Sequence, residues 1–294
     1  VMSFDYFRNT TKDQLMTIPL PASTGSEDIV VNFGENQNVG YDFSVAGQVI
    51  RNKNWAWTSV INGSHVKDRI KQISDKLKNT AYQLEEDNPL KLRFREGGSQ
   101  YDIYAVRSAG IDPATGQEIF INKNGEYTFK YDAEDEVVVG NTQPKLQGTW
   151  LNTLRYKGWS LNFVFSYTFG GDTYNKTLWE KVEDIDPRYN VDERAFTDRW
   201  KNPGDLSRYL AIKERRSTTP HNSERFVERL NELWLSSATL TYEFQPKFLK
   251  RLGFKRLAVG VGVSDIVRFS TVKYERGTSY PYCRTINLTF RPTF

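Results

Sequence analysis

Apolar and polar residues alternate with a period of two along several stretches of the chain. The clearest stretch has large apolar side chains at every second position, namely Trp159, Leu161, Phe163, Phe165, Tyr167 and Phe169. The opposite positions are small or polar, namely Ser160, Asn162, Val164, Ser166 and Thr168. A helix would scatter these residues around its axis, whereas a strand places each set on one face. The pattern predicts a β-strand with one apolar and one polar face.

Seven further stretches alternate in the same way, so the chain is expected to form about eight strands. They cover residues 2–6, 41–49, 55–61, 150–156, 234–244, 257–263 and 286–290. Short turns, such as those at 52–53 and 157–158, alternate with connections of about 17 to about 80 residues. All the long loops then leave one end of the sheet. Transmembrane β-barrels have this layout, with short periplasmic turns and long extracellular loops.

Alternation alone also fits a soluble β-sandwich, in which the apolar faces of two sheets pack together. Three features favour the barrel: aromatic residues gather near strand ends, as in membrane-interface girdles; the opposite faces suit a hydrated lumen; and the loops are asymmetric. We therefore expect an all-β fold, a segment of an antiparallel transmembrane barrel with long extracellular loops. A soluble β-sandwich module that binds carbohydrate is the alternative.

The composition of the chain excludes several classes of protein and several kinds of site. The chain is 14% aromatic and 38% hydrophobic, which argues against both a helical bundle and a disordered chain. Its 40 basic and 36 acidic residues are mixed, which leaves no nucleic-acid footprint. With one cysteine and two separated histidines, His65 and His221, neither a nucleophile–base pair nor a transition-metal site can be assembled. We expect no catalytic residue, no metal site and no cofactor.

Several short motifs then follow one another along the chain. They read DYF-x-x-TT-x-D within 3–13, N-x-N-x-G at 36–40, GIDP-x-TG at 110–116, YKG-x-x-L at 156–161 and RW-x-x-PGD at 199–205. In this order the motifs resemble the C-terminal part of SusC/RagA-type TonB-dependent outer-membrane transporters of the Bacteroidetes. The chain departs from the family after the PGD segment, where the usual proline is missing, and at 263–267.

The resemblance implies that residues 1–294 are the C-terminal part of a barrel of about 22 strands, with the plug domain and the early strands absent. It implies a non-catalytic role in a bacterial outer-membrane importer of oligosaccharides or peptides. The implied partners are outer-membrane lipid, a SusD-like lipoprotein over the loops at 66–140 and 170–229, and TonB through the missing N-terminal region. The eight strands should form an open, curved sheet with unpaired edges at 2–6 and 286–290, since they are only part of a barrel.

Two groups of residues are candidate functional positions. The last strand carries apolar residues of one parity, as barrel-assembly signals do, although an ordinary terminal strand also fits; they are Ile286, Leu288, Phe290 and Phe294. Aromatic residues in the long loops are candidates for ligand or partner contacts, or for packing of the loops on themselves; they are Tyr174, Trp179, Tyr189, Trp200 and Tyr209.

The long loops also contain local signals. Asn124-Gly125 lies between two short alternating stretches and predicts a hairpin with a type I′ turn. Acidic residues cluster at 132–136 and 183–192 without the spacing of an EF-hand, and we interpret them as solvated loop charge.

Overall fold

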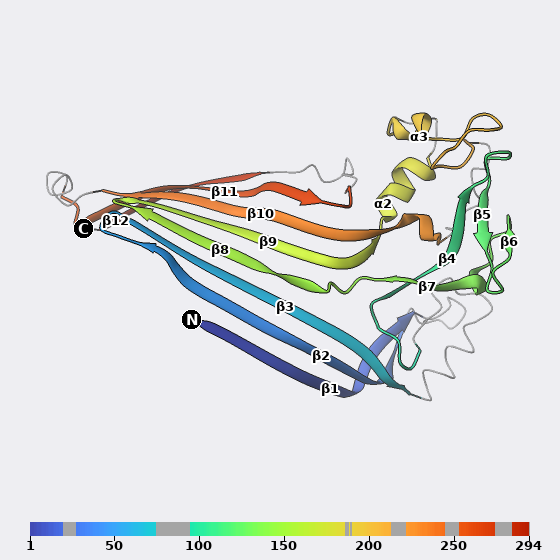
Figure 1. Ribbon diagram of the computed structural model, residues 1–294, viewed down its shortest axis with the longest axis horizontal. Coiled ribbons are helices and arrows are strands. Elements are labelled where there is room, and N and C mark those ends of the chain that lie inside the picture. Colours follow the sequence, from blue (N-terminus) through green and yellow to red (C-terminus); the bar gives the residue numbers. More distant parts are fainter. Residues whose placement is uncertain are drawn as a thin grey trace.

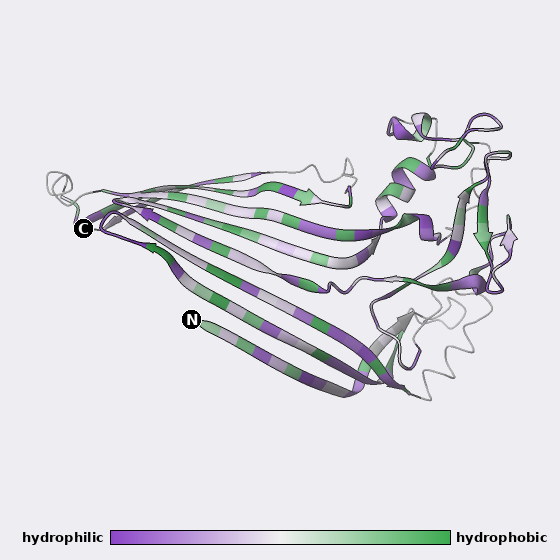
Figure 2. Ribbon diagram, viewed as in Figure 1, coloured by the Kyte–Doolittle hydropathy of each residue, from purple (hydrophilic) through white to green (hydrophobic). Residues whose placement is uncertain are grey.

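The computed structural model describes residues 1–19, 28–74, 95–185, 188, 190–212, 222–244, 253–273 and 284–293. Its main element is an antiparallel sheet of eight strands in sequential order (Figure 1). The strands are β1 (Met2–Pro19), β2 (Asp28–Arg51), β3 (Trp55–Ile73), β8 (Leu146–Tyr156), β9 (Trp159–Tyr174), β10 (Val227–Glu243), β11 (Arg256–Ser270) and β12 (Thr285–Thr293). The eight predicted strands are confirmed, and alternating hydropathy is visible along them in Figure 2.

Several strands extend far beyond their alternating stretches. β2 begins at Asp28 rather than near Tyr41, and its pairing with β1 continues from Met2↔Val45 to Pro19↔Asp28. A polar run at residues 35–38 interrupts the alternation between Phe33 and Val39, although the backbone ladder continues. The long connection expected between the stretches at 2–6 and 41–49 is therefore wrong, since only residues 20–27 separate β1 from β2.

The sheet is open among the described residues. β1 pairs with β2 and β12 pairs with β11, and no described residues link β1 to β12. Phe4 is 68% exposed and Leu288 is 85% exposed, as expected for edge strands. The expected open sheet is confirmed.

Short turns lie at one end of the strands. Arg51 ends β2 and Trp55 begins β3, and the backbone amide of Asn52 donates to the Trp55 carbonyl at 2.9 Å. Lys157, between β8 and β9, has a φ of 52°. The left-handed conformation is uncommon for a residue with a side chain and is typical of a tight turn.

The opposite end carries the long loops, which form structure of their own (Figure 1). A second sheet has the order β6-β5-β4-β7, with β4 (Asp102–Ile111), β5 (Glu118–Ile121), β6 (Tyr127–Thr128) and β7 (Glu136–Asn141). Short helical turns accompany it: η2 (Ala133–Asp135), α2 (Lys176–Leu178), η3 (Trp179–Glu183), α3 (Arg194–Thr197) and η5 (Glu224–Phe226). We call the described parts of residues 95–141 and 174–226 the loop module.

Within the described residues, no helix has the length and apolar character needed to cross a membrane.

The predicted hairpin is present, but its turn type is different. The amide of Gly125 donates to the Asn122 carbonyl, and the amide of Asn122 donates to the Glu126 carbonyl, both at 3.0 Å. Gly125 has a φ of 86°, whereas Asn124 is not in the left-handed region that a type I′ turn requires at both central positions. This geometry is a three-residue connection with glycine in the left-handed position.

Candidate functional site

The apolar side chains of the eight-stranded sheet lie in rows that cross the strands. One row follows the strand register and consists of Trp57, Leu154, Leu161, Leu240, Val261 and Leu288. Phe163 and Phe165 lie on this face, where Phe165 stacks on Trp150 at 5.5 Å and Phe163 meets Phe165 at 5.9 Å. No second sheet covers these rings within the described residues, which argues against the soluble sandwich.

Aromatic rows bound this apolar band at both ends. At the short-turn end Trp55 contacts Tyr156 at 4.4 Å and Trp159 contacts Tyr242 at 4.6 Å. At the loop end Tyr41 contacts His65 at 5.2 Å, and Tyr167 stacks on Phe169 at 5.7 Å. Trp55 and His65 are ten positions apart on β3, or roughly 34 Å along the strand. With a tilt of about 40° this corresponds to roughly 26 Å across a bilayer, close to the apolar band of outer-membrane barrels.

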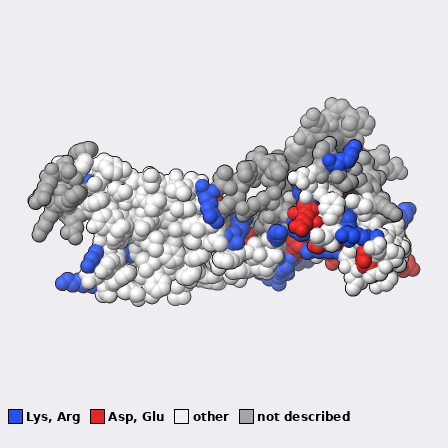
Figure 3. Space-filling model, turned by 90° about the horizontal axis from the view of Figure 1, so that it is seen from above, with Lys and Arg blue, Asp and Glu red and all other residues white. Residues whose placement is uncertain are grey.

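Two indole groups on the apolar face donate hydrogen bonds to polar side chains of the same face. The Nε1–H of Trp57 donates to Oδ1 of Asn152 at 3.0 Å, and the Nε1–H of Trp150 donates to Oγ of Ser59 at 2.8 Å. Asn152 is 2% exposed, so its carbonyl is shielded. Pairing reduces the cost of placing polar groups on a face that meets hydrocarbon. Figure 3 shows that charged residues are rare over the strands and gather over the loop module.

The opposite face of the sheet is polar. Two neighbouring rows on it line a hollow of about 530 Å³; they consist of Ser3, Ser44, Asn62, Thr149 and Ser166, and of Asp5, Asp42, Ser64, Gln147 and Thr168. Ser44 Oγ donates to Asn62 Oδ1 at 2.7 Å, and Asn62 Nδ2 donates to Thr149 Oγ1 at 3.3 Å. We call this surface the polar wall.

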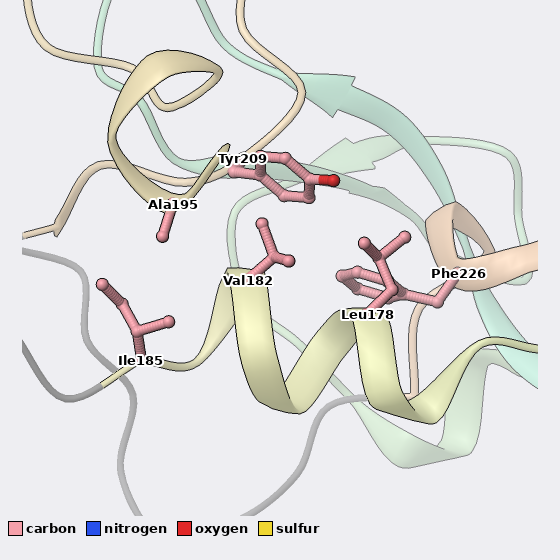
Figure 4. Close-up of a cluster of buried hydrophobic side chains, with 6 residues drawn as sticks. All are labelled: Leu178, Val182, Ile185, Ala195, Tyr209 and Phe226. Carbon is pink, nitrogen blue, oxygen red and sulfur yellow. The ribbon is translucent and has the colours of Figure 1, made fainter. Parts of the chain in front are cut away.

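The loop module has a hydrophobic core of its own (Figure 4). Six buried side chains form it, namely Leu178, Val182, Ile185, Ala195, Tyr209 and Phe226. They come from α2, η3, α3, a loop and η5, so the long connection between β9 and β10 folds on itself. These contacts give the module a fixed shape above the strands.

A buried ion cluster joins the two long loops. Nη2 of Arg225 lies 2.9 Å from Oε2 of Glu118 and 3.0 Å from Oε1 of Glu183. The side chains of Glu118 and Glu183 are 2% and 1% exposed. The Ser223 hydroxyl also donates to Glu118, and Arg225 Nη1 donates to the Arg208 carbonyl at 2.9 Å. The interpretation of Glu183 as solvated charge is wrong, because this carboxylate neutralises a buried arginine.

A second arginine organises the backbone of the module. The guanidinium of Arg199 donates to the carbonyls of Ala195, Leu210, Val182 and Glu183 at 2.6–3.0 Å. Main-chain carbonyls at the ends of short helices need donors, and a planar guanidinium can serve several at once. Arg199 therefore ties η3, α3 and the segment around Leu210 together.

Electrostatics in the module follow this packing. Burial alone would lower the pKa of Arg225, but its hydrogen bond to Glu118 and the charges of Glu118 and Glu183 raise it above the usual range. For Arg199, burial lowers the pKa of the guanidinium, which Glu183 and Asp184 partly oppose. The hydrogen bond from Arg194 holds the pKa of Asp192 at about 2.

Two turns in different loops also contact each other. Nε1 of Trp200 donates to the Pro113 carbonyl at 2.8 Å, and so does the backbone amide of Gly204. Thr115 Oγ1 donates to Asp112 within the first turn at 2.6 Å, and this hydrogen bond lowers the pKa of Asp112. The GIDP-x-TG and RW-x-x-PGD motifs are thus two sides of one contact.

The loop aromatics are mostly packing residues. Tyr209 is 1% exposed, and burial raises the pKa of its hydroxyl, so it cannot meet a ligand in this conformation. Tyr174 and Trp179 pack against the same core, and Trp200 covers the turn at Pro113. Tyr189 lies outside the described residues. Ligand or partner contact by the partly exposed rings stays a prediction, and loop packing, the other interpretation, accounts for their positions.

The last strand agrees with its predicted geometry. Ile286, Leu288 and Phe290 lie opposite Val263, Val261 and Val259, on the apolar face. Phe294 lies outside the described residues. The barrel-assembly role of these residues stays a prediction.

Sequence analysis missed the residues that hold the module together. Arg225, Glu118 and Ser223 stand in no motif, and 107 residues separate Arg225 from Glu118. Arg199 is part of a motif, but nothing in its neighbours indicates that it binds four carbonyls. Membership of the RW-x-x-PGD motif was therefore a signal for Arg199 alone.

Replacing Gly116 with alanine is expected to loosen the contact between the two turns. Gly116 has a φ of 75°, and an added Cβ would lie 2.5 Å from Cδ2 of Trp200. Strain and displacement of the indole should cost about 1–3 kcal/mol. Limited proteolysis of the loops in the intact protein measures the loss. Gly125→Ala is the control, because its φ of 86° carries the same backbone strain with nothing within 4 Å. Equal protease sensitivity of the two variants would contradict the role of the Trp200 contact.

Comparison with known proteins gives one consistent result. The chain is 25% identical over 311 residues to TonB-dependent receptor P39 of Formosa agariphila, a match that covers 92% of this chain and 30% of the receptor. TonB-dependent receptor P3 of the same organism is 26% identical over 290 residues, covering 92% of this chain and 28% of the receptor. The chain therefore spans about 30% of the length of these relatives. No protein-family profile matches.

Solved structures share the fold. The RagAB peptide transporter matches with a TM-score of 0.74 and 20% identity, covering 92% of this chain and 30% of the other. The RagAB peptide importer in its closed-closed state matches with a TM-score of 0.73 and 21% identity, covering 93% and 30%. The eight-stranded sheet thus has the fold of part of a transporter barrel. The matched proteins are named as receptors and transporters.

Proposed function

We propose that this chain forms one stretch of the barrel wall of an outer-membrane importer. Its similarity to part of the TonB-dependent receptors supports this proposal. One observation carries the proposal: an apolar face bounded by two aromatic rows lies back to back with a polar wall. In a membrane barrel the first faces lipid and the second faces the lumen. The two open edges of the sheet would pair with strands outside this chain, since unpaired backbone is costly in hydrocarbon.

Within the whole protein, residues 1–294 would be the C-terminal strands of a barrel of about 22, with plug and early strands on the preceding chain. TonB would act through that preceding region. The polar wall would then line the import path. Hydroxyl, amide and carboxylate groups can bind the backbone of a peptide or the hydroxyls of a sugar without holding either tightly.

The substrate would be an oligopeptide or an oligosaccharide. RagAB, whose fold the sheet shares, is a peptide transporter, and this supports the peptide. Asp5 and Asp42 lie opposite each other in the polar wall, so cationic peptides are the substrates that this surface would attract most.

The loop module would be the contact surface for a SusD-like lipoprotein. Its buried ion cluster and core give it a fixed shape before binding, which lowers the entropic cost of association. Large apolar side chains nevertheless remain exposed on it, namely Tyr127, Phe129, Phe196 and Leu206, with Leu206 90% exposed. Exposed apolar residues on an ordered surface mark interaction sites.

The test uses the complete protein in cells that lack their own copy. We expect uptake of labelled oligopeptides or oligosaccharides and co-purification of a surface lipoprotein. Leu206→Asp should reduce the co-purified lipoprotein by more than about tenfold, the order of a hot-spot loss. Arg51→Asp, at the opposite end of the strands, is the control and should have no effect. Absence of uptake for both substrate classes, with the protein inserted in the membrane, would reject the importer.

A further inference from the structure

Basic side chains gather on the outward, apolar side of β1 and β3, just beyond the aromatic row at the loop end. Arg8, Lys67 and Arg69 are exposed on this side, and Lys71 is exposed at the β-bulge just beyond Arg69. Arg8 and Lys67 both lie opposite Val39 in the register, and Arg69 lies opposite Gln37 on the same strand. Because neighbouring strands are about 4.8 Å apart, Arg8 and Lys67 start about 10 Å from each other. We call these four residues the basic cluster.

The basic cluster shares its face with the aromatic row. Tyr6, Tyr41 and His65 stand opposite one another in the register, two positions nearer to the apolar band than Arg8, Val39 and Lys67. Side chains two positions apart on a strand point to the same side. The Tyr41 ring lies 6.0 Å from Phe4 and 5.2 Å from His65, which confirms that these rings share a face. The cluster therefore begins where the apolar band ends, at the depth of lipid headgroups.

Charges of opposite sign are segregated on these strands. Asp5, Asp42 and Asp68 belong to the opposite parity and face the polar wall or the loops above it. Both carboxylate oxygens of Asp68 accept hydrogen bonds from Ser99 and Gln100 of the loop. Two described carboxylates lie near the cluster. Glu35 of β2 stands two positions beyond Gln37, and Glu96 of the following loop accepts a hydrogen bond from the amide of Ile73 at 3.2 Å. Among the described residues no ion pair joins the four cations to a carboxylate, so the cluster keeps a net positive charge.

We propose that Arg8, Lys67, Arg69 and Lys71 bind the phosphate groups of lipid A, the phosphorylated glycolipid of the outer leaflet. The long loops of such barrels are extracellular, so this end of the strands lies at the outer leaflet. Arginine matches phosphate oxygens in a bidentate manner, and lysine adds point charge. The acyl chains of the same lipid would lie against Phe4, Tyr6 and Tyr41 beneath the cluster. One lipid would bind both the basic cluster and the aromatic residues beneath it, whereas a soluble acidic partner would bind only the cluster.

The test measures lipid binding by the complete protein in detergent. Purified lipid A, dephosphorylated lipid A and inorganic phosphate are the three probes. Each removed charge near an anionic headgroup should weaken binding about fivefold, so Lys67→Gln with Arg69→Gln should weaken lipid A binding by on the order of twentyfold. The control is Arg51→Gln with Lys53→Gln, the same charge change at the short-turn end. It should leave lipid A binding unchanged, and dephosphorylated lipid A should bind to the wild type at least as weakly as lipid A binds to the variant, which keeps Arg8 and Lys71.

Three results would overturn the site. The first is equal lipid A binding by wild type and the Lys67 and Arg69 variant, with both shown to be folded by heat-modifiable gel mobility. The second is binding of inorganic phosphate as tight as that of lipid A, which would mean recognition of an anion alone. The third is an acidic protein that co-purifies with the wild type and occupies the cluster in place of lipid. The inference rests on the membrane position of the strands and not on import, so uptake measured on the same variants separates the two proposals.

Discussion

Replacing Arg225 with methionine is expected to destabilise the loop module by about 3–5 kcal/mol, the cost of breaking a buried ion pair from one side. The guanidinium is shared by Glu118 and Glu183, whose side chains are almost fully buried, and it packs on the Phe226 ring at 4.9 Å. Methionine preserves much of the apolar stem but cannot neutralise the carboxylates. Hydrogen exchange in the described segments 102–141, 174–185 and 190–212 of the intact protein measures the loss, since local opening reports local stability.

Arg256→Met is the matched control for this variant. Arg256 pairs with Glu243 at 2.8 Å, but the two side chains are 71% and 51% exposed. Exposed pairs contribute about 0–1 kcal/mol, so exchange in the loop module should not change. Wild-type protection in the Arg225 variant would mean that the two long loops are held together by something other than this cluster. Loss of lipoprotein binding together with loss of protection would link the module's rigidity to its partner.

Replacing Phe165 with arginine is expected to destabilise the barrel by about 2–4 kcal/mol, the cost of a cationic side chain at the bilayer midplane. Phe165 lies on the apolar face between the aromatic rows and stacks on Trp150. Its replacement therefore also removes an aromatic contact. Urea unfolding of the complete protein in phospholipid vesicles measures the difference.

Asn162→Arg is the control for the assignment of the faces. Asn162 belongs to the polar parity of the same strand, where its Oδ1 accepts a hydrogen bond from Thr153 at 2.8 Å, and it is exposed. A cation there meets water in the lumen, so only the lost hydrogen bond, about 1 kcal/mol, should be seen. If Asn162→Arg lowered the free energy of unfolding more than Phe165→Arg, the assignment of the lipid-facing and lumen-facing sides would be wrong.

The alternation in the sequence determined the strands that cross the membrane band. A strand between lipid and water must place its apolar and polar side chains on opposite faces, and therefore alternates them with a period of two. Residues 159–169 show this alternation. It placed each residue of the row from Trp57 to Leu288 on the apolar face of its strand, whereas the open edges were expected from the family resemblance. It could not predict that β2 begins at Asp28, because the polar run at residues 35–38 interrupts the period.

The structure of the loop module depends on tertiary contacts that the sequence does not reveal. A type I′ turn was expected at Asn124-Gly125 from two residues, yet the closing hydrogen bonds to Asn122 select a different turn. Glu183 belongs to an acidic stretch that looks solvated in sequence, but Arg225 lies 42 residues away and 3.0 Å distant in space. Burial of a charge depends on which distant residue folds onto it, and no local pattern carries that information. The sequence by itself therefore determined the membrane-spanning wall, whose environment acts on each strand separately, while long-range packing alone decided how the loops above it are held.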